Sequence, residues 1–335
     1  MSETKKLDVL SIGDAYIDAF VKLEDANASV EEREAGPKLV MDYGVKVPFD
    51  HSEVVEGVGN AANAAVSISR LGHGVGIISN VGSDNWGRDV IQALGKEEVD
   101  TRFVRTNPGK KTGYHYILWY KSDRTILIKH VPYDYHFPHI KPTETPAWIY
   151  LTSVAEDTLE FHDDIADWLD ANPGVKLAFQ PGTYQMKFGA ERLKRLYQRT
   201  NLLFLNREEA VTVGGGKHED LNDLFDKLHV LGPKTICITD GPDGAYASNG
   251  HDRYKMPNYP DPAPPLERTG AGDAFASTFL AATLHGLSIE EALRYAPINS
   301  MSVVQKVGAQ AGLLTMDELR AYLSHAPESY KPTKL

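Results

Sequence analysis

Short apolar runs alternate along the chain with longer stretches in which apolar residues recur at helical spacing. The short runs predict buried strands, and the longer stretches predict amphipathic helices. The predicted strands are Val9–Ile12, Val75–Val81, Trp148–Thr152, Lys176–Phe179, Leu202–Leu205 and Thr235–Thr239. The predicted helices are Ala61–Leu71, Arg88–Glu97, Phe161–Asp170, Gly189–Gln198, Leu221–Leu228, Ala276–Leu284 and Ala292–Val304. Because strands and helices alternate, we expect an α/β fold with a doubly wound, mostly parallel sheet flanked by helices, in one domain over residues 1–335.

Two segments do not follow this alternation. Residues 16–56 contain charged and extended stretches, and residues 112–130 alternate in hydrophobicity like a hairpin. The hairpin strands would be Tyr114–Tyr120 and Thr125–Ile128, joined by a turn at 121–124. We expect the two segments to form a small β-lid added to the main sheet. Its aromatic side chains could cover a ligand or hold the contact of a homodimer.

Composition narrows the class of protein. The net charge is −11, from 35 Lys and Arg residues against 46 Asp and Glu residues, so a basic surface for nucleic acid is not expected. Cys237 is the only cysteine, which excludes an internal disulfide framework and favours a reducing compartment. The sequence has no run of about eighteen apolar residues, the length that a membrane span needs. The expectation is a soluble, cytoplasmic protein with neither a nucleic acid nor a membrane as its partner.

The segment Arg268-Thr269-Gly270-Ala271-Gly272-Asp273 precedes an apolar helical run. Small residues at a helix start let backbone N–H groups approach an anion closely, and the helix dipole adds to the attraction. Asp273 would lie in the first turn, beside these amides. A carboxylate next to an anion site suits proton removal from a hydroxyl group during phosphoryl transfer. From this motif alone, a purely structural interpretation is equally good, in which the glycines form a tight turn and Asp273 stabilises the start of the helix.

Other short motifs precede this one along the chain. They are Gly13-Asp14-Ala15-Tyr16-Ile17-Asp18, Val58-Gly59-Asn60-Ala61-Ala62-Asn63, Asn206-Arg207-Glu208-Glu209 and Thr239-Asp240-Gly241-Pro242-Asp243-Gly244. In type and order, these motifs resemble the signatures of the PfkB-type carbohydrate kinases, the ribokinase-like family, and the resemblance covers nearly the whole chain. It implies a ribokinase-like fold and ATP-dependent phosphoryl transfer to a hydroxymethyl group of a small sugar or sugar derivative.

The resemblance also implies a role for each motif. Asp273 would be the catalytic base, and the amides of Gly270, Ala271 and Gly272 would stabilise the transferring group. The residues implied in acceptor binding are Asp18, Asp14, Gly59 and Asn63. The residues implied in nucleotide binding are Thr239, Gly241, Gly244 and Asn299. The residues implied in Mg²⁺ binding are Asn206 and Glu209, and the expected cofactors are ATP and Mg²⁺.

Several alternatives stay open. Asn206 and Glu209 also fit a capping-box variant at a helix start, and residues 239–244 also fit the turn of a hairpin. The acceptor could be a nucleoside that stacks on the aromatic lid, or the chain could bind a sugar without catalysis. Arg268 lies in a stretch that helps to form a monovalent-cation site in many relatives, and its fixed charge predicts activity that does not depend on potassium.

Overall fold

The structure of the chain is a computed structural model that describes residues 6–34, 36–121, 123–218 and 220–335. Within these ranges the large sheet has the strand order β16-β15-β14-β13-β12-β11-β10-β1-β6-β7. Its strands are β1 (Val9–Ile12), β6 (Val75–Gly82), β7 (Val104–Asn107), β10 (Trp148–Leu151), β11 (Lys176–Phe179), β12 (Thr200–Asn206), β13 (Thr235–Thr239), β14 (Ala245–Ser248), β15 (Arg253–Met256) and β16 (Thr333–Lys334). The pairs from β7 to β13 are parallel, and β13 to β16 pair antiparallel. The predicted doubly wound sheet is therefore confirmed.

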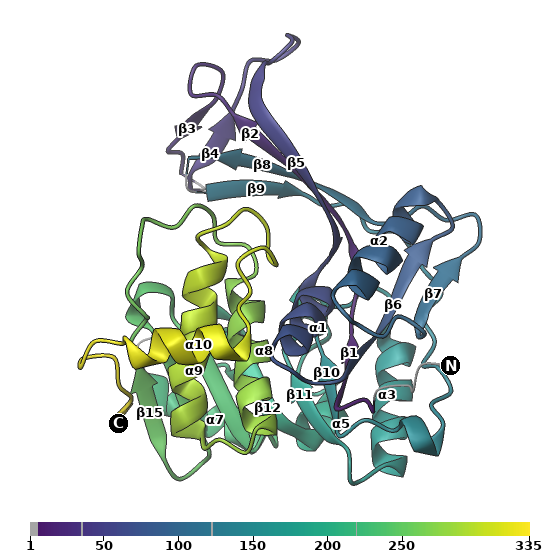
Figure 1. The fold of residues 1–335 in the computed structure, drawn as a ribbon, viewed down its shortest axis with the longest axis vertical. Helices are drawn as coiled ribbons and strands as arrows, with labels where there is room; N and C mark the ends of the chain where they lie inside the picture. Colours follow the sequence, from purple (N-terminus) through teal and green to yellow (C-terminus); the bar gives the residue numbers. More distant parts are fainter. Residues whose placement is uncertain (1–5, 35, 122, 219) are drawn as a thin grey trace.

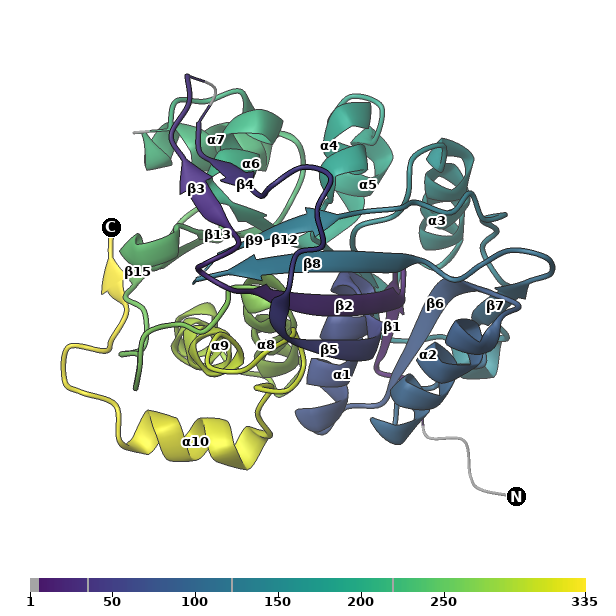
Figure 2. The same ribbon diagram turned by 90° about the horizontal axis from the view of Figure 1, so that it is seen from above.

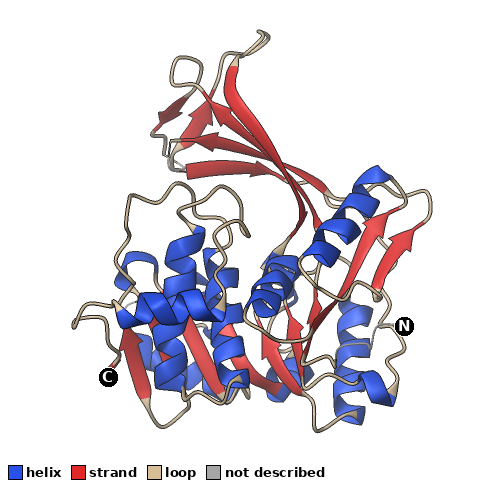
Figure 3. Ribbon diagram, in the orientation of Figure 1, coloured by secondary structure: helices blue, strands red, loops and turns tan. Residues whose placement is uncertain are grey.

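Helices cover both faces of the large sheet (Figure 3). One face carries α1 (Asn60–Arg70), α2 (Asn85–Lys96), α8 (Ala271–Leu284), α9 (Ile289–Val303) and α10 (Met316–Ser324). The other face carries α3 (Leu159–Ala171), α4 (Thr183–Phe188), α5 (Lys194–Arg199), α6 (Arg207–Gly214) and α7 (Leu221–Val230). Short 3₁₀ turns are η1 (Pro142–Glu144) and η2 (Gly241–Asp243).

The strand residues alternate between two large apolar clusters. Along β1, Val9 packs in the cluster under α1 and α8, whereas Leu10 and Ile12 pack in the cluster under α3 and α5. Both faces of a parallel sheet are buried by helices, so its strands read as continuous apolar runs. This burial explains why short apolar runs located the central strands. Within the described ranges, none of the helices combines the length and the apolar character needed to cross a bilayer.

One predicted helix is wrong in its bounds. The periodicity predicts a single helix over Gly189–Gln198, but α4 ends at Phe188 and α5 begins only at Lys194. Gly189 has a φ of 83°, in the left-handed region that ends a helix. The chain between the two helices therefore turns before α5 packs on the sheet.

A second, smaller sheet lies over the ends of the central strands (Figures 1 and 2). It has the order β5-β2-β8-β9, with β2 (Tyr16–Leu23), β5 (Phe49–Val58), β8 (Tyr114–Tyr120) and β9 (Asp123–Leu127). The pair β3 (Ser29–Glu31) and β4 (Lys38–Val40) extends the connection between β2 and β5. We call the four strands β5, β2, β8 and β9 the small sheet. Strands β8 and β9 pair antiparallel as the predicted hairpin requires, and Ser122 in the predicted turn lies outside the described residues.

Candidate active site

Three cavities adjoin one another along the ends of the parallel strands. The α9 cavity, of about 370 Å³, lies between α9 and the loop at 241–244. The central cavity, of about 230 Å³, contains Asp273. The tyrosine cavity, of about 360 Å³, is named for its four tyrosines, which are Tyr16, Tyr133, Tyr135 and Tyr184.

Shared residues connect the three cavities. Thr239, Arg268, Gly272 and Phe275 line both the α9 cavity and the central cavity, and Asn60 lines both the central cavity and the tyrosine cavity. Ligands of open α/β sheets bind outside the carboxyl ends of the strands, which is where this row of cavities lies. Two ligands, one at each end of the row, would meet beside Asp273.

Asp273 is held by side-chain amides from two other elements. Its Oδ1 accepts hydrogen bonds from Asn60 Nδ2 at 2.9 Å and from Gln180 Nε2 at 3.2 Å, and its Oδ2 accepts one from Asn63 Nδ2 at 2.8 Å. Asn60 and Asn63 lie three residues apart in the first turn of α1, so both face α8. Burial raises the pKa of Asp273 to about 6, although the three amides act to lower it. A carboxyl group with this pKa is suited to take up a proton near neutral pH.

The start of α8 presents free backbone amides to the same place. Gly270 is the N-cap residue, with a φ of 81°, and a Cβ atom there would lie 2.5 Å from the Cβ of Ala309. Only glycine fits such a position without strain. The first N–H groups of a helix have no partner within the helix, and Gly270 and Gly272 line the central cavity. The predicted anion site at residues 270–272 therefore lies beside the Asp273 carboxylate.

Asn206 and Glu209 line the central cavity and also form the capping box of α6. Asn206 Oδ1 accepts a hydrogen bond from the Glu209 N–H, and Glu209 Oε2 accepts one from the Asn206 N–H, each at 2.8 Å. Burial raises the pKa of Glu209, the Asn206 N–H lowers it, and the negative charges of Glu208 and Asp273 raise it further. Two carboxylates that face one small cavity suit a hard cation, and Mg²⁺ needs few protein ligands when phosphate oxygens are present. The residues present therefore fit Mg²⁺.

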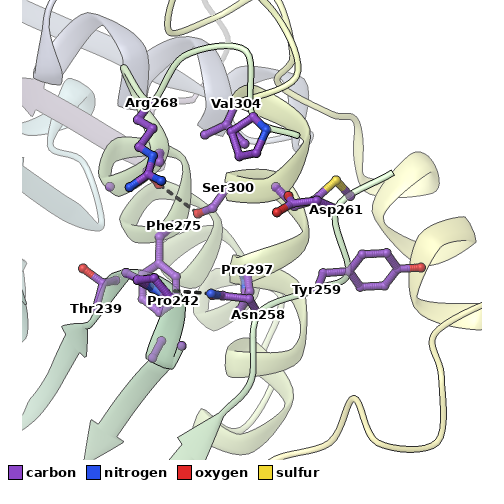
Figure 4. A pocket seen from close by; sticks show the side chains of 17 residues that line it. Thr239, Pro242, Asn258, Tyr259, Asp261, Arg268, Phe275, Pro297, Ser300 and Val304 are labelled. Carbon is purple, nitrogen blue, oxygen red and sulfur yellow. Dashed lines mark hydrogen bonds between the residues drawn. The ribbon is translucent and has the colours of Figure 1, made fainter. Parts of the chain in front are cut away.

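The predicted nucleotide residues are only partly brought together. Thr239, Gly241 and Gly244 line the α9 cavity. They belong to the turn between β13 and β14, so the hairpin interpretation of this loop is also correct. Figure 4 shows Arg268 and Thr239 on one side of this cavity and Asp261 and Tyr259 on the other.

Asn299 does not line the α9 cavity. Residues 297, 300, 301 and 304 line it, at the spacing of one helix face, and position 299 lies on the opposite side of α9. Asn299 is fully buried, donates to Thr278 Oγ1 at 2.8 Å and accepts from the Leu314 N–H at 2.9 Å. In this structure the Asn299 side chain therefore joins α9 to α8 and to the turn before α10, and does not reach the cavity where it was predicted to bind the nucleotide.

The tyrosine cavity holds Asp14 rather than Asp18. The hydroxyl of Tyr135 donates to Asp14 Oδ1 at 2.5 Å, and burial raises the pKa of Asp14 to about 6 against the lowering effect of that bond. His115 stacks on Tyr16, with ring centroids 3.9 Å apart, and its Nδ1 lies 3.5 Å from Asp18 Oδ1. Asp18 pairs with His115 across β2 and β8, is 7% exposed and does not line the tyrosine cavity, whereas His115 does.

Gly59 and Asn63 are also placed differently from the expectation of direct acceptor contact. Gly59 has a φ of 119°, and a Cβ atom there would lie 2.4 Å from the carbonyl oxygen of Asp14. The backbone that approaches Gly59 closely is thus the protein's own. Asn63 gives its amide N–H to Asp273 and accepts a hydrogen bond from Gln310, so it positions the carboxylate.

Sequence reasoning missed three residues of the central cavity. Asn60 fits a helix cap by its position, but Gly59 is the N-cap and the amide of Asn60 binds Asp273. Gln180 follows β11 and donates to Asp273. Its position as a polar residue directly after a buried parallel strand could have indicated that it lies at the site. Arg124 comes from β9 of the small sheet, and nothing in its local sequence indicated that it would reach Asp273's cavity.

Comparison with known proteins agrees with this geometry. The profile of the pfkB family carbohydrate kinases matches residues 41–316. A ribokinase from Haemophilus influenzae is 27% identical over 80% of this chain and 87% of its own length. A cytidine kinase from Thermococcus kodakarensis is 29% identical over 75% of this chain and 88% of its own length. The chain belongs to the pfkB family of carbohydrate kinases.

Solved structures show the same fold. Arabidopsis thaliana ribokinase, solved with ribose and ATP, covers 95% of this chain with a TM-score of 0.76 and 20% identity, over 99% of its own length. An Escherichia coli protein solved with ATP and Mg²⁺ covers 95% of this chain and 99% of its own, with a TM-score of 0.75 and 17% identity. The family and the fold together make this protein an ATP-dependent carbohydrate kinase that acts on a small molecule. ATP and Mg²⁺ are in general the cofactors of such kinases.

Proposed function

We propose that this kinase phosphorylates a hydroxymethyl group of a small sugar or sugar derivative bound in the tyrosine cavity. The observation that carries the proposal is the shared lining of the three cavities, because it places one buried carboxylate between two ligand-sized spaces. The α9 cavity would take the nucleotide. Asp14, His115 and the tyrosine hydroxyls offer donors and acceptors to a polyol, which a polar small molecule needs for orientation.

In the proposed reaction, Asp273 accepts the proton of the acceptor hydroxyl as its oxygen bonds to the γ-phosphorus of ATP. The bond between that phosphorus and the oxygen that bridges to the β-phosphate breaks, and ADP leaves. The transition state is loose and mainly needs alignment and neutralised charge. The amides at residues 270–272 donate hydrogen bonds to the transferring group, and Asn60, Asn63 and Gln180 keep the Asp273 carboxylate in place.

Asn206 and Glu209 would hold Mg²⁺ at the central cavity, with water between the protein and the ion. When bound, Mg²⁺ supplies positive charge to the phosphate oxygens. Glu209 uses only its Oε2 atom in the capping box. Its second oxygen is available to a metal-bound water.

We further propose that the small sheet is a lid, formed by the segments 16–56 and 112–130 of this single-domain kinase. A lid excludes water, which would otherwise accept the phosphoryl group. Tyr116 and Leu127, which pair across β8 and β9, are exposed on one face of the small sheet at 51% and 50% of their surface, and Ile126 is exposed on the other face at 38%. These apolar side chains support a homodimer formed through the lid. Sedimentation velocity of the wild type and of an Ile126→Lys, Leu127→Lys double variant tests it, and a monomeric wild type would rule it out.

A panel of sugars, sugar derivatives and nucleosides, with ADP release measured in the presence of Mg²⁺, tests the function. We expect one sugar class to give turnover well above the rate without acceptor. Turnover on none of the sugars would contradict the proposal.

A nucleoside acceptor is the second candidate, and a specific cavity favours it. Trp86, Tyr114 and Tyr116 form an aromatic wall that adjoins the tyrosine cavity, with ring centroids 5.3 Å and 5.1 Å apart. A base could stack there while its ribose occupies the tyrosine cavity. Turnover on a nucleoside that is lost in Trp86→Ala but unaffected in the surface variant Tyr43→Ala, at a fully exposed aromatic residue, would favour this candidate over a simple sugar.

A further inference from the structure

Two arginines from distant parts of the chain converge on the central cavity. Arg124 comes from β9 of the small sheet, and Arg268 comes from the loop before α8. Among the described residues that line this cavity, they are the cations, and Glu209 and Asp273 are the acids. Without the two guanidinium groups, the two carboxylates would repel an incoming phosphate. With them, the formal charges of the lining balance.

Neither guanidinium group has its hydrogen bonds satisfied by the protein. Within the described ranges, the Arg268 side chain is exposed and makes no hydrogen bond, and its charge acts on Asp261, which lines the α9 cavity with it, from beyond ion-pair distance. The Nε atom of Arg124 is buried and has no hydrogen-bond partner among the described residues, where the acid within ion-pair distance is Glu267, with Oε2 at 3.9 Å. A guanidinium group carries five N–H donors in a fixed plane. Donors that the protein does not use at a cavity are available to an anionic ligand.

Glu267 does not form a hydrogen bond with Arg124. This glutamate is 1% exposed, and its two carboxylate oxygens already accept backbone N–H groups, from Thr269 at 2.7 Å and from Gly308 at 3.1 Å. At 3.9 Å the pair is too long for a hydrogen bond. The contact holds the arginine of the small sheet near the loop before α8 and leaves its donors for another partner.

We propose that Arg124 and Arg268 form a guanidinium clamp on the phosphates of the nucleotide and on the phosphoryl group during its transfer. The clamp rests on the proposed function, since it assigns that reaction its phosphate-binding residues. Arg268 lines both the α9 cavity and the central cavity, so it lies where the triphosphate passes from one to the other. Arg124 belongs to the small sheet, so its contact with the phosphoryl group depends on how that sheet sits over the site. Arginine binds phosphate through two parallel hydrogen bonds, which aligns the group as well as neutralising it.

The clamp also supplies the positive charge that a monovalent cation would otherwise bring. Two like charges about 4 Å apart repel strongly at the effective dielectric of a protein. An ion placed beside Glu267 would meet the guanidinium group of Arg124. We therefore expect activity that does not depend on potassium.

Nucleotide binding tests Arg268 without any acceptor. Calorimetry would compare a non-hydrolysable ATP analogue with AMP in the wild type, in Arg268→Gln and in Arg320→Gln, a control at an exposed arginine of α10. We expect Arg268→Gln to lower the affinity for the ATP analogue at least about tenfold. The affinity for AMP should not change, because AMP has no phosphate that reaches the central cavity. Equal affinities in Arg268→Gln and the control would overturn the role of Arg268. This result does not depend on the identity of the acceptor, so it separates the clamp from the proposed function.

Turnover tests Arg124. We expect Arg124→Gln to lower kcat at least about tenfold with little change in nucleotide affinity, and free guanidinium ions at millimolar concentration to restore part of the rate in Arg124→Ala. A merely structural role would not give this rescue. A kcat within about twofold of the wild type would overturn the clamp, as would a several-fold activation of the wild type by potassium at constant ionic strength.

Discussion

At the scale of single residues, the acidity of Asp273 sets the pH range of the reaction. Burial raises its pKa to about 6, and only the ionised carboxylate can accept the hydroxyl proton. We therefore expect kcat/KM to be constant above this value and to fall about tenfold per pH unit below it. Rates in overlapping buffers from about pH 5 to about pH 8 would show this limb. Burial raises the pKa of Asp14 to a similar value, so the Asp14→Asn variant is the control. If kcat/KM still falls at low pH in this variant, the fall belongs to Asp273. If the fall disappears, it belongs to Asp14.

Removal of the base itself gives a second prediction. Asp273→Asn keeps the shape of the side chain but removes the charge, and we expect kcat to fall by about 10² to 10⁴. Affinity for the nucleotide should stay close to that of the wild type, because the carboxylate acts on the acceptor. Steady-state kinetics and calorimetry on the same preparation check both statements. Near-normal turnover in this variant would remove Asp273 from its proposed role.

The third prediction separates the two roles of Glu209. Glutamine can replace glutamate in a capping box, so Glu209→Gln should fold normally. The loss of charge should raise the Mg²⁺ concentration needed for half-maximal rate more than it raises the acceptor KM. Glu208→Gln, at the exposed neighbouring position, is the matched control. An unchanged Mg²⁺ dependence would leave Glu209 as a capping residue only.

Several site residues were predictable because their chemistry is local. Asp273, Glu209 and Gly270 belong to short motifs whose helix starts place them directly. Asn63 and Asn299 do not line the cavities expected for them, because their side chains hydrogen-bond to other elements: Asn63 donates to Asp273, 210 positions away, and Asn299 accepts from Leu314 across the turn after α9. A motif does not specify which side of a helix faces a distant element.

At the scale of elements, the start of α8 depends on a glycine. In Gly270→Ala, the left-handed backbone alone costs about 1–2 kcal/mol of stability, and the new Cβ would meet Ala309 at 2.5 Å. We expect a lower urea midpoint, and lower activity from displaced amides. Gly95→Ala is the matched control, because Gly95 lies within α2 with nothing within 4 Å of a Cβ there, and it should stabilise by about 0.5–1 kcal/mol. Equal midpoints for the two variants would contradict this account.

The elements themselves were predictable to different degrees. The central strands, buried on both faces, followed directly from apolar runs, and β1, β11 and β13 have the predicted bounds. The helix predicted over 189–198 begins five residues before α5, which starts at Lys194, and the separate helix α4 over Thr183–Phe188 was not predicted. In the small sheet, β8 was predicted as one strand of a hairpin, and its residues from Tyr114 to Leu118 do alternate in burial. The pairing of β2 with β8 joins segments far apart in the sequence, and the sequence of neither segment indicates it.

At the scale of the whole molecule, the small sheet should respond to ligands. If it is a lid, binding of acceptor and nucleotide analogue together should slow backbone hydrogen exchange in β8 and β9. Exchange in α7, on a face of the large sheet away from the three cavities, serves as the internal control. Mass spectrometry of the free and the doubly liganded protein measures both. Identical exchange of β8 and β9 in the two states would mean that the small sheet does not close.

The hydrogen bonds that hold Asp273 have a consequence for how the enzyme is made. The donors Asn60 and Asn63 precede it by 213 and 210 positions, and Gln180 precedes it by 93. Contacts of such long range form late, because the chain between them must first be closed into a loop. A nascent chain on the ribosome can thus pair β1 with β6 long before α8 exists. Recovery of activity during refolding therefore reports the docking of α8 on α1, whereas far-ultraviolet circular dichroism also records the earlier assembly of the sheet.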